Sequence, residues 1–246
     1  MENILFGLLI GIFVSLIGGG GASLYLGVLS GQLSTATAVS TSLFVALPAL
    51  FFGTLTQIHI HNVHFKIGNQ LIIAAVPSII IGTLLSHYIP EKNYTIVIGI
   101  LLTVMGLIVL RKNLRQQQTP SRPHQHALIA YLLGIISGLM VGLGGLSGGA
   151  TTVAGLSMMG LTTFEAAGTT TYVLCAMSLV GFISHLISST IAWSAGLTLM
   201  IGAIIGSILT PLVLTHVDLK KLNQPLGIFL GLVVVFFGVK MLLTVF

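Results

Sequence analysis

The stretch Ser15-Leu16-Ile17-Gly18-Gly19-Gly20-Gly21-Ala22-Ser23 places four consecutive glycines in the middle of an apolar run. Each glycine costs an α-helix about 1 kcal/mol relative to alanine, so the run predicts that a helix breaks here. No charged side chain occurs between Glu2 and Lys66, which puts the break at membrane depth. The freed backbone groups must therefore face protein, water or a ligand. Close packing between helices is the competing explanation, and this run alone does not decide between the two.

A second glycine-rich stretch, Gly138-Leu-Met-Val-Gly-Leu-Gly-Gly145-Leu-Ser-Gly-Gly-Ala150, repeats residues 11–23 after a shift of 127 positions. With one inserted residue the likeness continues, so that 34–42 corresponds to 162–170 and 65–68 to 193–196. These correspondences predict an internal duplication. Interrupted hydrophobic segments at matching positions of two halves indicate the substrate site of a secondary transporter.

The composition is that of a membrane protein. Of the 246 residues, 55% are hydrophobic and only 5% are charged, with a mean hydropathy of +1.10. Soluble domains usually have about 25% charged residues. We therefore expect a multi-pass protein of the plasma or inner membrane, surrounded by the lipid bilayer. The nine Lys and Arg residues lie in short loops, where they indicate topology, so no nucleic-acid partner is expected.

Several other functions lack the residues they need. The single cysteine, Cys175, lies in an apolar run and predicts neither a disulfide framework nor a metal cluster. His59, His61 and His64 are closely spaced, but without a carboxylate or thiol nearby they predict no metal site. No nucleophile and base recur at a workable spacing, so we expect no enzyme activity and no cofactor.

Apolar segments divide the chain into two similar halves. Most of them fit one membrane crossing of about 20 residues. The first and fifth are longer, too long for one upright crossing and short for two, so each is expected to be a broken helix or a re-entrant hairpin. Residues 112–126 form a polar linker whose cations predict a cytoplasmic location. The segments are 4–31, 37–58, 67–86, 94–111, 127–158, 165–190, 195–215 and 224–245.

The predicted fold class is an all-α polytopic membrane protein with two homologous halves, 1–111 and 127–246. Each half opens with a glycine-interrupted or re-entrant helix, followed by three transmembrane helices. If both opening segments cross the membrane, the Lys and Arg residues split six to three between inside and outside. If both are re-entrant, the split is seven to two, the termini lie outside, and the second half repeats the first upside down. The count slightly favours this inverted repeat.

The glycine segments and the Ser/Thr-rich elements after them resemble the TauE/SafE-like family of sulfite exporters and sulfonate-uptake permeases. The matching elements are Gly18–Gly21 with Ser40-Thr41-Ser42, and Gly144–Gly149 with Gly168-Thr169-Thr170. The resemblance covers nearly the whole chain, because that family is also built from two homologous halves. It implies a permease for small anions, often sulfur-containing ones such as sulfite or organosulfonates, and it names the substrate class only loosely.

The residue types expected near the midplane agree with an anion. Hydroxyls and backbone amides occur there, whereas a dedicated cation site would need Asp or Glu. No Lys or Arg lies near the middle of a crossing, so helix dipoles and hydrogen bonds would hold the anion. Hydrogen bonds within or between helices are the competing interpretation for each hydroxyl. The predicted substrate-binding residues are Gly18, Gly19, Gly20, Gly21, Ser40, Thr41, Ser42, Gly144, Gly145, Ser147, Gly148, Gly149, Thr169, Thr170 and Thr171.

Two titratable residues are candidates for proton coupling. Glu165 begins an apolar segment, where stabilising the helix dipole is its simpler role. His185 lies late in the same segment, where an interfacial position is the simpler interpretation. The leading hypothesis is an anion carrier that works by alternating access between its repeats, and the alternative is an anion-selective channel lined by the two glycine breaks. A homodimer is left open.

Overall fold

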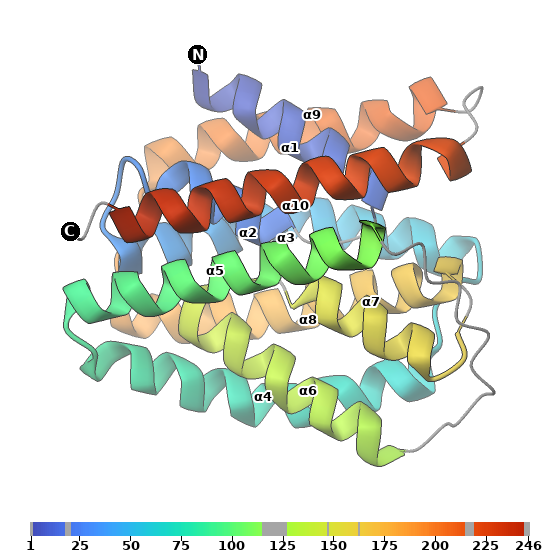
Figure 1. Ribbon diagram of the computed structural model, residues 1–246, viewed down its shortest axis with the longest axis horizontal. Coiled ribbons are helices and arrows are strands. Elements are labelled where there is room, and N and C mark those ends of the chain that lie inside the picture. Colours follow the sequence, from blue (N-terminus) through green and yellow to red (C-terminus); the bar gives the residue numbers. More distant parts are fainter. Residues whose placement is uncertain are drawn as a thin grey trace.

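The computed structural model describes residues 2–17, 21–114, 127–146, 148–161, 163–214 and 219–243. Every regular element in these ranges is an α-helix, as the composition predicts, and no strand occurs in them (Figure 1). The helices of the first half are α1 (Glu2–Ile17), α2 (Gly21–Leu29), α3 (Thr35–His59), α4 (Phe65–Tyr88) and α5 (Glu91–Leu114). Those of the second half are α6 (Ala127–Gly144), α7 (Gly149–Met158), α8 (Thr163–Ser188), α9 (Trp193–Leu214) and α10 (Leu219–Leu243).

Four helices of the described chain are long and apolar enough to cross a membrane. They are α3, α4, residues 91–111 of α5 and residues 165–186 of α8. Large apolar side chains also point outward from several helices, as Ile73 of α4, Leu128 of α6 and Phe236 of α10 do, with more than half of each side chain exposed. Because a soluble protein would not expose so many large apolar side chains, these surfaces fit contact with lipid.

Both predicted glycine breaks are present. In the first half α1 ends at Ile17 and α2 begins at Gly21, and in the second half α6 ends at Gly144 and α7 begins at Gly149. The glycines Gly18, Gly19 and Gly20 and the serine Ser147 lie outside the described residues.

The chain turns back at each break, so that a helical hairpin forms. After α2 the chain returns to the start of α1, where Gln32 Nε2 lies 3.5 Å from Asn3 Oδ1. In the second hairpin, Ser137 of α6 is hydrogen-bonded to Thr152 of α7 at 3.1 Å. Of the two arrangements expected for these long segments, the structure therefore has the hairpin.

The helices run between two ends of the molecule, which we call the terminal end and the linker end. Figure 1 shows the C-terminus and the starts of α3, α5 and α9 on the left, at the terminal end. The end of α5 and the start of α6 lie on the right, at the linker end. The start of α4 also meets the start of α8 there, through a 2.9 Å contact between His64 Nε2 and Glu165 Oε1.

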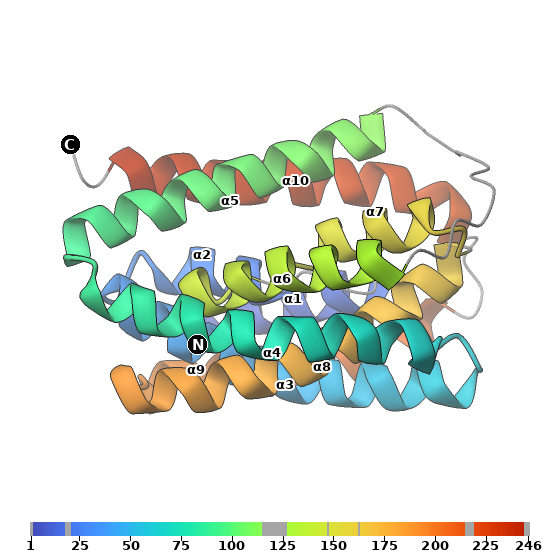
Figure 2. The same cartoon turned by 90° about the horizontal axis from the view of Figure 1, so that it is seen from below.

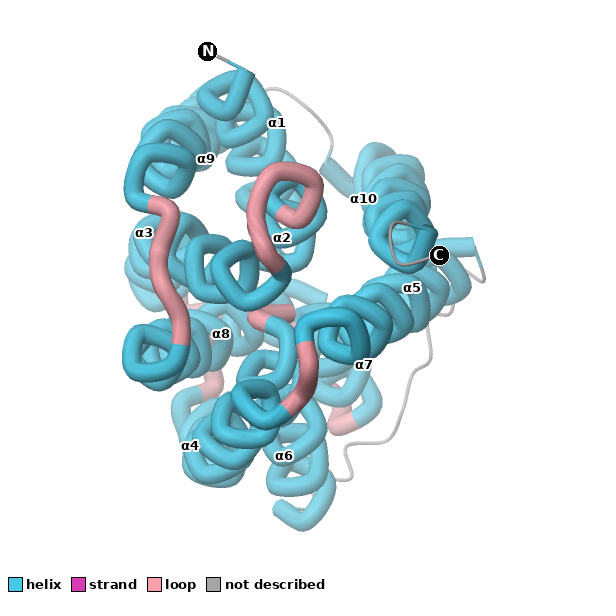
Figure 3. Tube along the Cα trace, turned by 90° about the vertical axis from the view of Figure 1, so that its left-hand side faces the viewer, coloured by secondary structure: helices cyan, strands magenta, loops and turns pink. Residues whose placement is uncertain are grey.

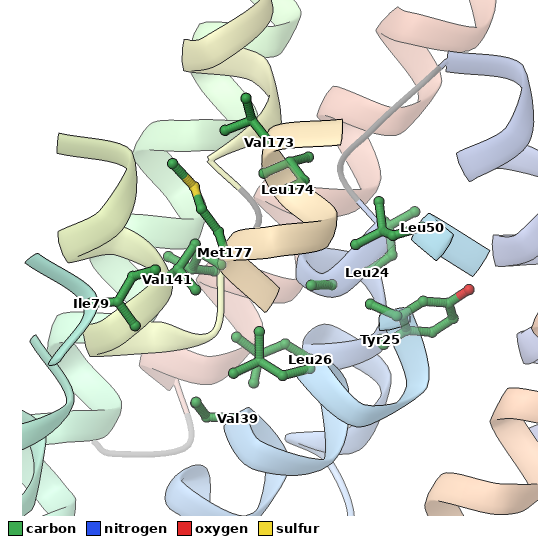
Figure 4. Packing of buried hydrophobic residues seen from close by; sticks show 14 of the residues in the cluster. Leu24, Tyr25, Leu26, Val39, Leu50, Ile79, Val141, Val173, Leu174 and Met177 are labelled. Atoms are coloured by element: carbon green, nitrogen blue, oxygen red, sulfur yellow. The ribbon is translucent and has the colours of Figure 1, made fainter. Parts of the chain in front are cut away.

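The long helices pack in pairs around the hairpins. Helix α1 lies along α9. Figure 2 shows α4 along α6 and α5 along α10. Seen along the helices in Figure 3, α2 and α7 lie toward the middle, and the longer helices surround them. The core joins both halves, because Figure 4 shows Met177 of α8 close to Val141 of α6 and Ile79 of α4, and Tyr25 of α2 close to Leu50 of α3.

Glycines allow the backbones of paired helices to approach closely. A Cβ atom at Gly138 of α6 would lie 2.6 Å from the carbonyl oxygen and 2.8 Å from the Cα of Ala75 on α4. A Cβ atom at Gly11 of α1 would likewise lie too close to the carbonyl oxygen and the Cα of Ala203 on α9. Small residues at such crossings are the usual basis of helix association in membranes.

We expect Gly138→Ala to destabilise the protein, because the added methyl group forces α4 and α6 apart. The cost should be about 1–3 kcal/mol, as for other overpacked sites. Thermal denaturation in detergent measures it. The matched control is Gly31→Ala, where the nearest atom to an added Cβ is Lys240 Nζ at 3.6 Å. A melting temperature in Gly138→Ala equal to that of the control would show that the close approach is not required.

Candidate functional site

The second break is built around a glycine with a left-handed backbone. Gly145 has a φ of +58°, which side-chain-bearing residues rarely adopt, and its N–H donates to Val141 O at 2.8 Å. The position is also closed to a side chain. A Cβ there would lie 2.9 Å from Val39 Cγ1 and 3.2 Å from Ser42 Oγ, both on α3. The break therefore lies directly against one of the predicted Ser/Thr elements.

Side chains from other helices cap the carbonyl end of α6 at this break. Gly142 O accepts a hydrogen bond from Thr83 of α4 at 3.3 Å and lies 2.9 Å from His185 Nε2 of α8. Leu143 O accepts a hydrogen bond from the Tyr94 hydroxyl of α5 at 2.6 Å. The last carbonyls of a helix have no partner within it, so these three side chains satisfy groups that would otherwise be buried without one. The sequence analysis had assigned no role to Thr83 or Tyr94.

The amide end of α7 begins on the other side of the same break. Gly148 and Gly149 are buried, and a Cβ at Gly148 would lie 2.8 Å from Ser137 Cβ on α6. The first N–H groups of a helix have no carbonyl partner within it and carry a partial positive charge. At this break the capped carbonyl end of α6 and the amide end of α7 therefore both lie in one buried region.

The first break is described only from Gly21 onward, which is buried at the start of α2. One turn into this helix lies Tyr25, whose side chain is completely buried. Its hydroxyl has no hydrogen-bond partner among the described residues. The sequence analysis did not single out Tyr25, because a tyrosine in an apolar run gives no signal of an unpaired hydroxyl.

The predicted hydroxyls of the first half are buried and mostly serve as links between helices. Ser40 Oγ donates to Thr190 O at 2.8 Å, and Thr41 Oγ1 accepts the N–H of Ala192 at 3.1 Å. Ser42 Oγ donates to a carbonyl of its own helix at 2.8 Å. The competing interpretation of these residues, as structural hydrogen-bonding groups, therefore has direct support. Their contact with a substrate remains a prediction.

The hydroxyls of the second half follow a similar pattern, with one exception. Thr169 Oγ1 accepts the N–H of His64 at 3.0 Å, and Thr171 Oγ1 donates to Ala167 O at 3.0 Å. Thr170 is completely buried, and its hydroxyl has no partner among the described residues. A buried hydroxyl without a partner is unfavourable, so Thr170 is the member of this set most in need of a ligand or water.

We expect Thr41→Val and Thr169→Val each to lower the free energy of unfolding by about 1–3 kcal/mol, because each leaves a backbone N–H at the start of another helix unpaired. Chemical or thermal denaturation in detergent measures the change. Thr56→Val is the control, since the Thr56 hydroxyl is exposed and donates only to Phe52 O of its own helix. Unchanged stability in both variants would show that neither hydrogen bond contributes.

Glu165 lies at the linker end, away from the breaks. Its carboxylate contacts His64 Nε2 at 2.9 Å, and both side chains are partly exposed. Beside it, Phe65 and Tyr172 pack edge to face with ring centroids 5.3 Å apart. Glu165 therefore helps to join the start of α4 to the start of α8, in addition to lying in the first turn of its helix.

His185 lies elsewhere, toward the terminal end of α8. Only 2% of its surface is exposed, so its side chain is packed inside the protein, whereas its position relative to the membrane interface stays a prediction. It lines a cavity of about 140 Å³ together with residues from α4, α5 and the connection before α3. The structure thus separates the two candidates for proton coupling, with Glu165 at one end of the molecule and His185 near the second break.

Comparison with known proteins identifies relatives of the whole chain. The family described as "Sulfite exporter TauE/SafE" matches residues 3–241. The curated "Probable membrane transporter protein YunE" of Bacillus subtilis (strain 168) is 26% identical over 230 residues, which cover 82% of this chain and 84% of that protein. No solved structure matches the chain.

Proposed function

Because the chain belongs to the sulfite exporter TauE/SafE family of membrane transporters, we propose that it is a permease for a small anion. A sulfur-containing anion such as sulfite or an organosulfonate is the best candidate, bound between the two halves and moved by alternating access. The single observation that carries this proposal is the second break, where α7 begins at Gly149 close to Gly145 while the carbonyls of α6 are capped from other helices.

The charge of the interior supports an anion. The polar side chains that are buried in the described chain are Ser and Thr residues, Tyr25, Tyr94 and His185, with no Asp, Glu, Lys or Arg among them. A buried cation would need carboxylates or many oxygen ligands. The amide ends of α2 and α7 each supply about half a positive charge, so the two together could balance one anion. We place the anion between the glycine breaks.

Internal symmetry supports the duplication that this site requires. The counterparts of α1 and α9 in the other half are α6 and α4. Both pairs, α1 with α9 and α6 with α4, pack along each other. Two aromatic pairs also match, because Phe44 and Trp193 have centroids 5.3 Å apart at 73°, and Phe65 and Tyr172 have centroids 5.3 Å apart at 74°. We infer two repeats, 1–111 and 127–246, joined by the linker 112–126.

The directions of the helices support an inverted arrangement of these repeats. The contacts of Gly134 with Leu71 and of Gly142 with Ile79 show that α4 and α6 run in the same direction. The contacts of Gly99 with Gly238 and of Gly106 with Gly231 show that the equivalent helices α5 and α10 run in opposite directions. Counterparts that run oppositely are expected for a pseudo-two-fold axis in the membrane plane. We assign the linker end to the cytoplasm by its cations.

Uptake into proteoliposomes tests the proposed function. The panel contains sulfite, sulfate, organosulfonates and carboxylates, each at the same ionic strength, with protein-free liposomes as the control. We expect saturable uptake of one or a few sulfur-containing anions. Uptake of cations or neutral solutes without any of these anions would overturn the proposal.

Exchange across the membrane separates the carrier from an anion-selective channel. In a carrier, unlabelled anion inside the vesicle accelerates entry of labelled anion, because the loaded site returns faster than the empty one. A continuous pore gives no such acceleration. We expect counterflow, and its absence in vesicles that conduct the anion would favour the channel.

A further inference from the structure

A cavity near the terminal end reaches His185, whose ring contacts the end of α6 at the second glycine break. The cavity of about 140 Å³ is lined by Glu91 and Tyr94 of α5, Ser86 of α4, and Ser189 and His185 from the end of α8. Glu91 is exposed, whereas His185 is buried. A volume of this size has room for several water molecules. The cavity therefore gives His185 a route to water although its side chain is hidden from the surface.

Ser86, Ser189, Tyr94 and Glu91 present oxygen acceptors to this cavity, which Ser34 and His87 also line. The hydroxyls of Ser86 and Ser189 donate to carbonyls one turn back in the chain, at 2.7 and 3.0 Å, and Tyr94 donates to Leu143 O at 2.6 Å. The lone pairs of these hydroxyl oxygens can therefore accept hydrogen bonds from water in the cavity. Glu91 adds a carboxylate that already accepts the N–H of Thr35 at 3.3 Å. These oxygen acceptors suit water and an incoming proton.

The two ring nitrogens of His185 have different surroundings. Nε2 is hydrogen-bonded at the second break, and Nδ1 can accept a proton. Its Nε2 lies 2.9 Å from Gly142 O, in the last turn of α6, and donates a hydrogen bond to that carbonyl. No hydrogen bond to Nδ1 occurs in the described part of the chain, so in the neutral ring Nδ1 carries a lone pair. The negative end of the α6 dipole favours a positive imidazolium at this place.

We propose that His185 is the proton-binding group that couples anion transport to a proton, and that the cavity beside Glu91 is its proton route. The inference rests on the proposed function, because it assigns a coupling ion to the same site. The titratable groups that share the cavity with His185 are Tyr94 and Glu91 of α5 and His87 of α4. The α6 side of the ring contributes only the Gly142 carbonyl among the described contacts.

The coupling step moves one proton. A hydronium ion in the cavity transfers its proton to the Nδ1 lone pair, an N–H bond forms, and a water molecule remains. The imidazolium keeps its Nε2 hydrogen bond to Gly142, three residues before Gly145. Its positive charge then lies beside the break where we place the anion, so the proton and the anion strengthen each other's binding.

The test is binding of methanesulfonate and sulfate, whose charges stay constant in this range, measured by thermal shift at about pH 6 and about pH 8, on either side of the usual imidazole titration. We expect binding to the wild-type protein to be about fivefold or more tighter at the lower pH, a typical coupling between two sites. In His185→Gln, whose side-chain amide can still donate to Gly142 O, we expect the same binding at both pH values within about twofold.

Two control variants distinguish proton binding by His185 from the structural capping of the α6 carbonyls. Tyr94→Phe removes the hydrogen bond to Leu143 O but should keep the pH dependence. His59→Gln removes an exposed histidine at the linker end and should also keep it. A second measurement uses only the wild-type protein. In weakly buffered solution near neutral pH, binding of methanesulfonate should take up protons, which a pH indicator records.

The outcomes distinguish this inference from the proposed function. Equal pH dependence in His185→Gln and wild type would overturn the inference, as would anion binding without proton uptake. Both results would leave the anion site in place. If neither anion stabilises the wild-type protein at either pH, the proposed function and this inference fall together.

Discussion

Anion uptake is expected to fall to background in Gly148→Leu, with the protein still inserted in the membrane. A Cβ at Gly148 would already lie 2.8 Å from Ser137 Cβ and 3.1 Å from Ser137 Cα, so a leucine must push α7 away from α6. The amide end of α7 would then move from the break and be covered by an apolar side chain. We expect a loss of at least about tenfold, which is about 1.4 kcal/mol of binding free energy.

The control for this variant is Gly31→Leu, because Gly31 is exposed and an added Cβ there would make only ordinary contacts, the nearest at 3.6 Å. Gly148→Ala should be milder than Gly148→Leu, since it adds one methyl group. Surface expression and size-exclusion profiles confirm insertion and folding. Normal transport by properly inserted Gly148→Leu would mean that the break is structural and that the substrate binds elsewhere.

The second large effect concerns topology. A Cys175-free protein with a cysteine at position 2 or position 246 should be labelled by a membrane-impermeant reagent from the outside, and a cysteine in the linker 112–126 only from the inside. Two distances support this, because Gln32 Nε2 lies 3.5 Å from Asn3 Oδ1, and a Cβ at Gly31 would lie 3.6 Å from Lys240 Nζ. They bring the starts of α1 and α3 and the end of α10 to one end of the molecule.

Labelling of both terminal positions only from the cytoplasm would contradict the inverted repeat. The control is the same reagent on permeabilised cells, where every position should react. The readout is all or none, so it does not depend on small differences in exposure.

The features that the sequence predicted correctly are those that depend on nearby residues. The breaks at residues 17–21 and 144–149 follow from the local preferences of glycine. The length of the opening segments left both a broken helix and a hairpin open, so the sequence did not decide the hairpin. The helical class follows from a composition that places nearly the whole chain in a membrane, where helices satisfy their own backbone groups.

The caps of α6 could not be predicted in this way. Thr83, Tyr94 and His185 reach the carbonyls of Gly142 and Leu143 from three different helices, and nothing in the sequence near those glycines indicates these partners. A carbonyl without a helical partner predicts that some donor must be present, but the packing of α4, α5 and α8 decides which one.

The pair of His64 and Glu165 was missed for the same reason. The sequence analysis considered His64 only as a metal ligand and Glu165 as a group near the helix dipole or a proton carrier. Their side chains meet at 2.9 Å although they are 101 residues apart. Likewise the hydroxyls of Thr41 and Thr169 were considered for substrate binding, but the direction of each hydroxyl depends on where α9 and α4 begin.

Thermal stabilisation by salts tests the central claim, that a buried site between the glycine breaks binds a small anion, most directly. The purified protein is heated with sodium and choline salts of sulfate, methanesulfonate, acetate and chloride at constant ionic strength. The account predicts that stabilisation depends on the anion, is greatest for a sulfur-containing one, and is the same for sodium and choline. Stabilisation that depends on the cation and is indifferent to the anion would contradict it.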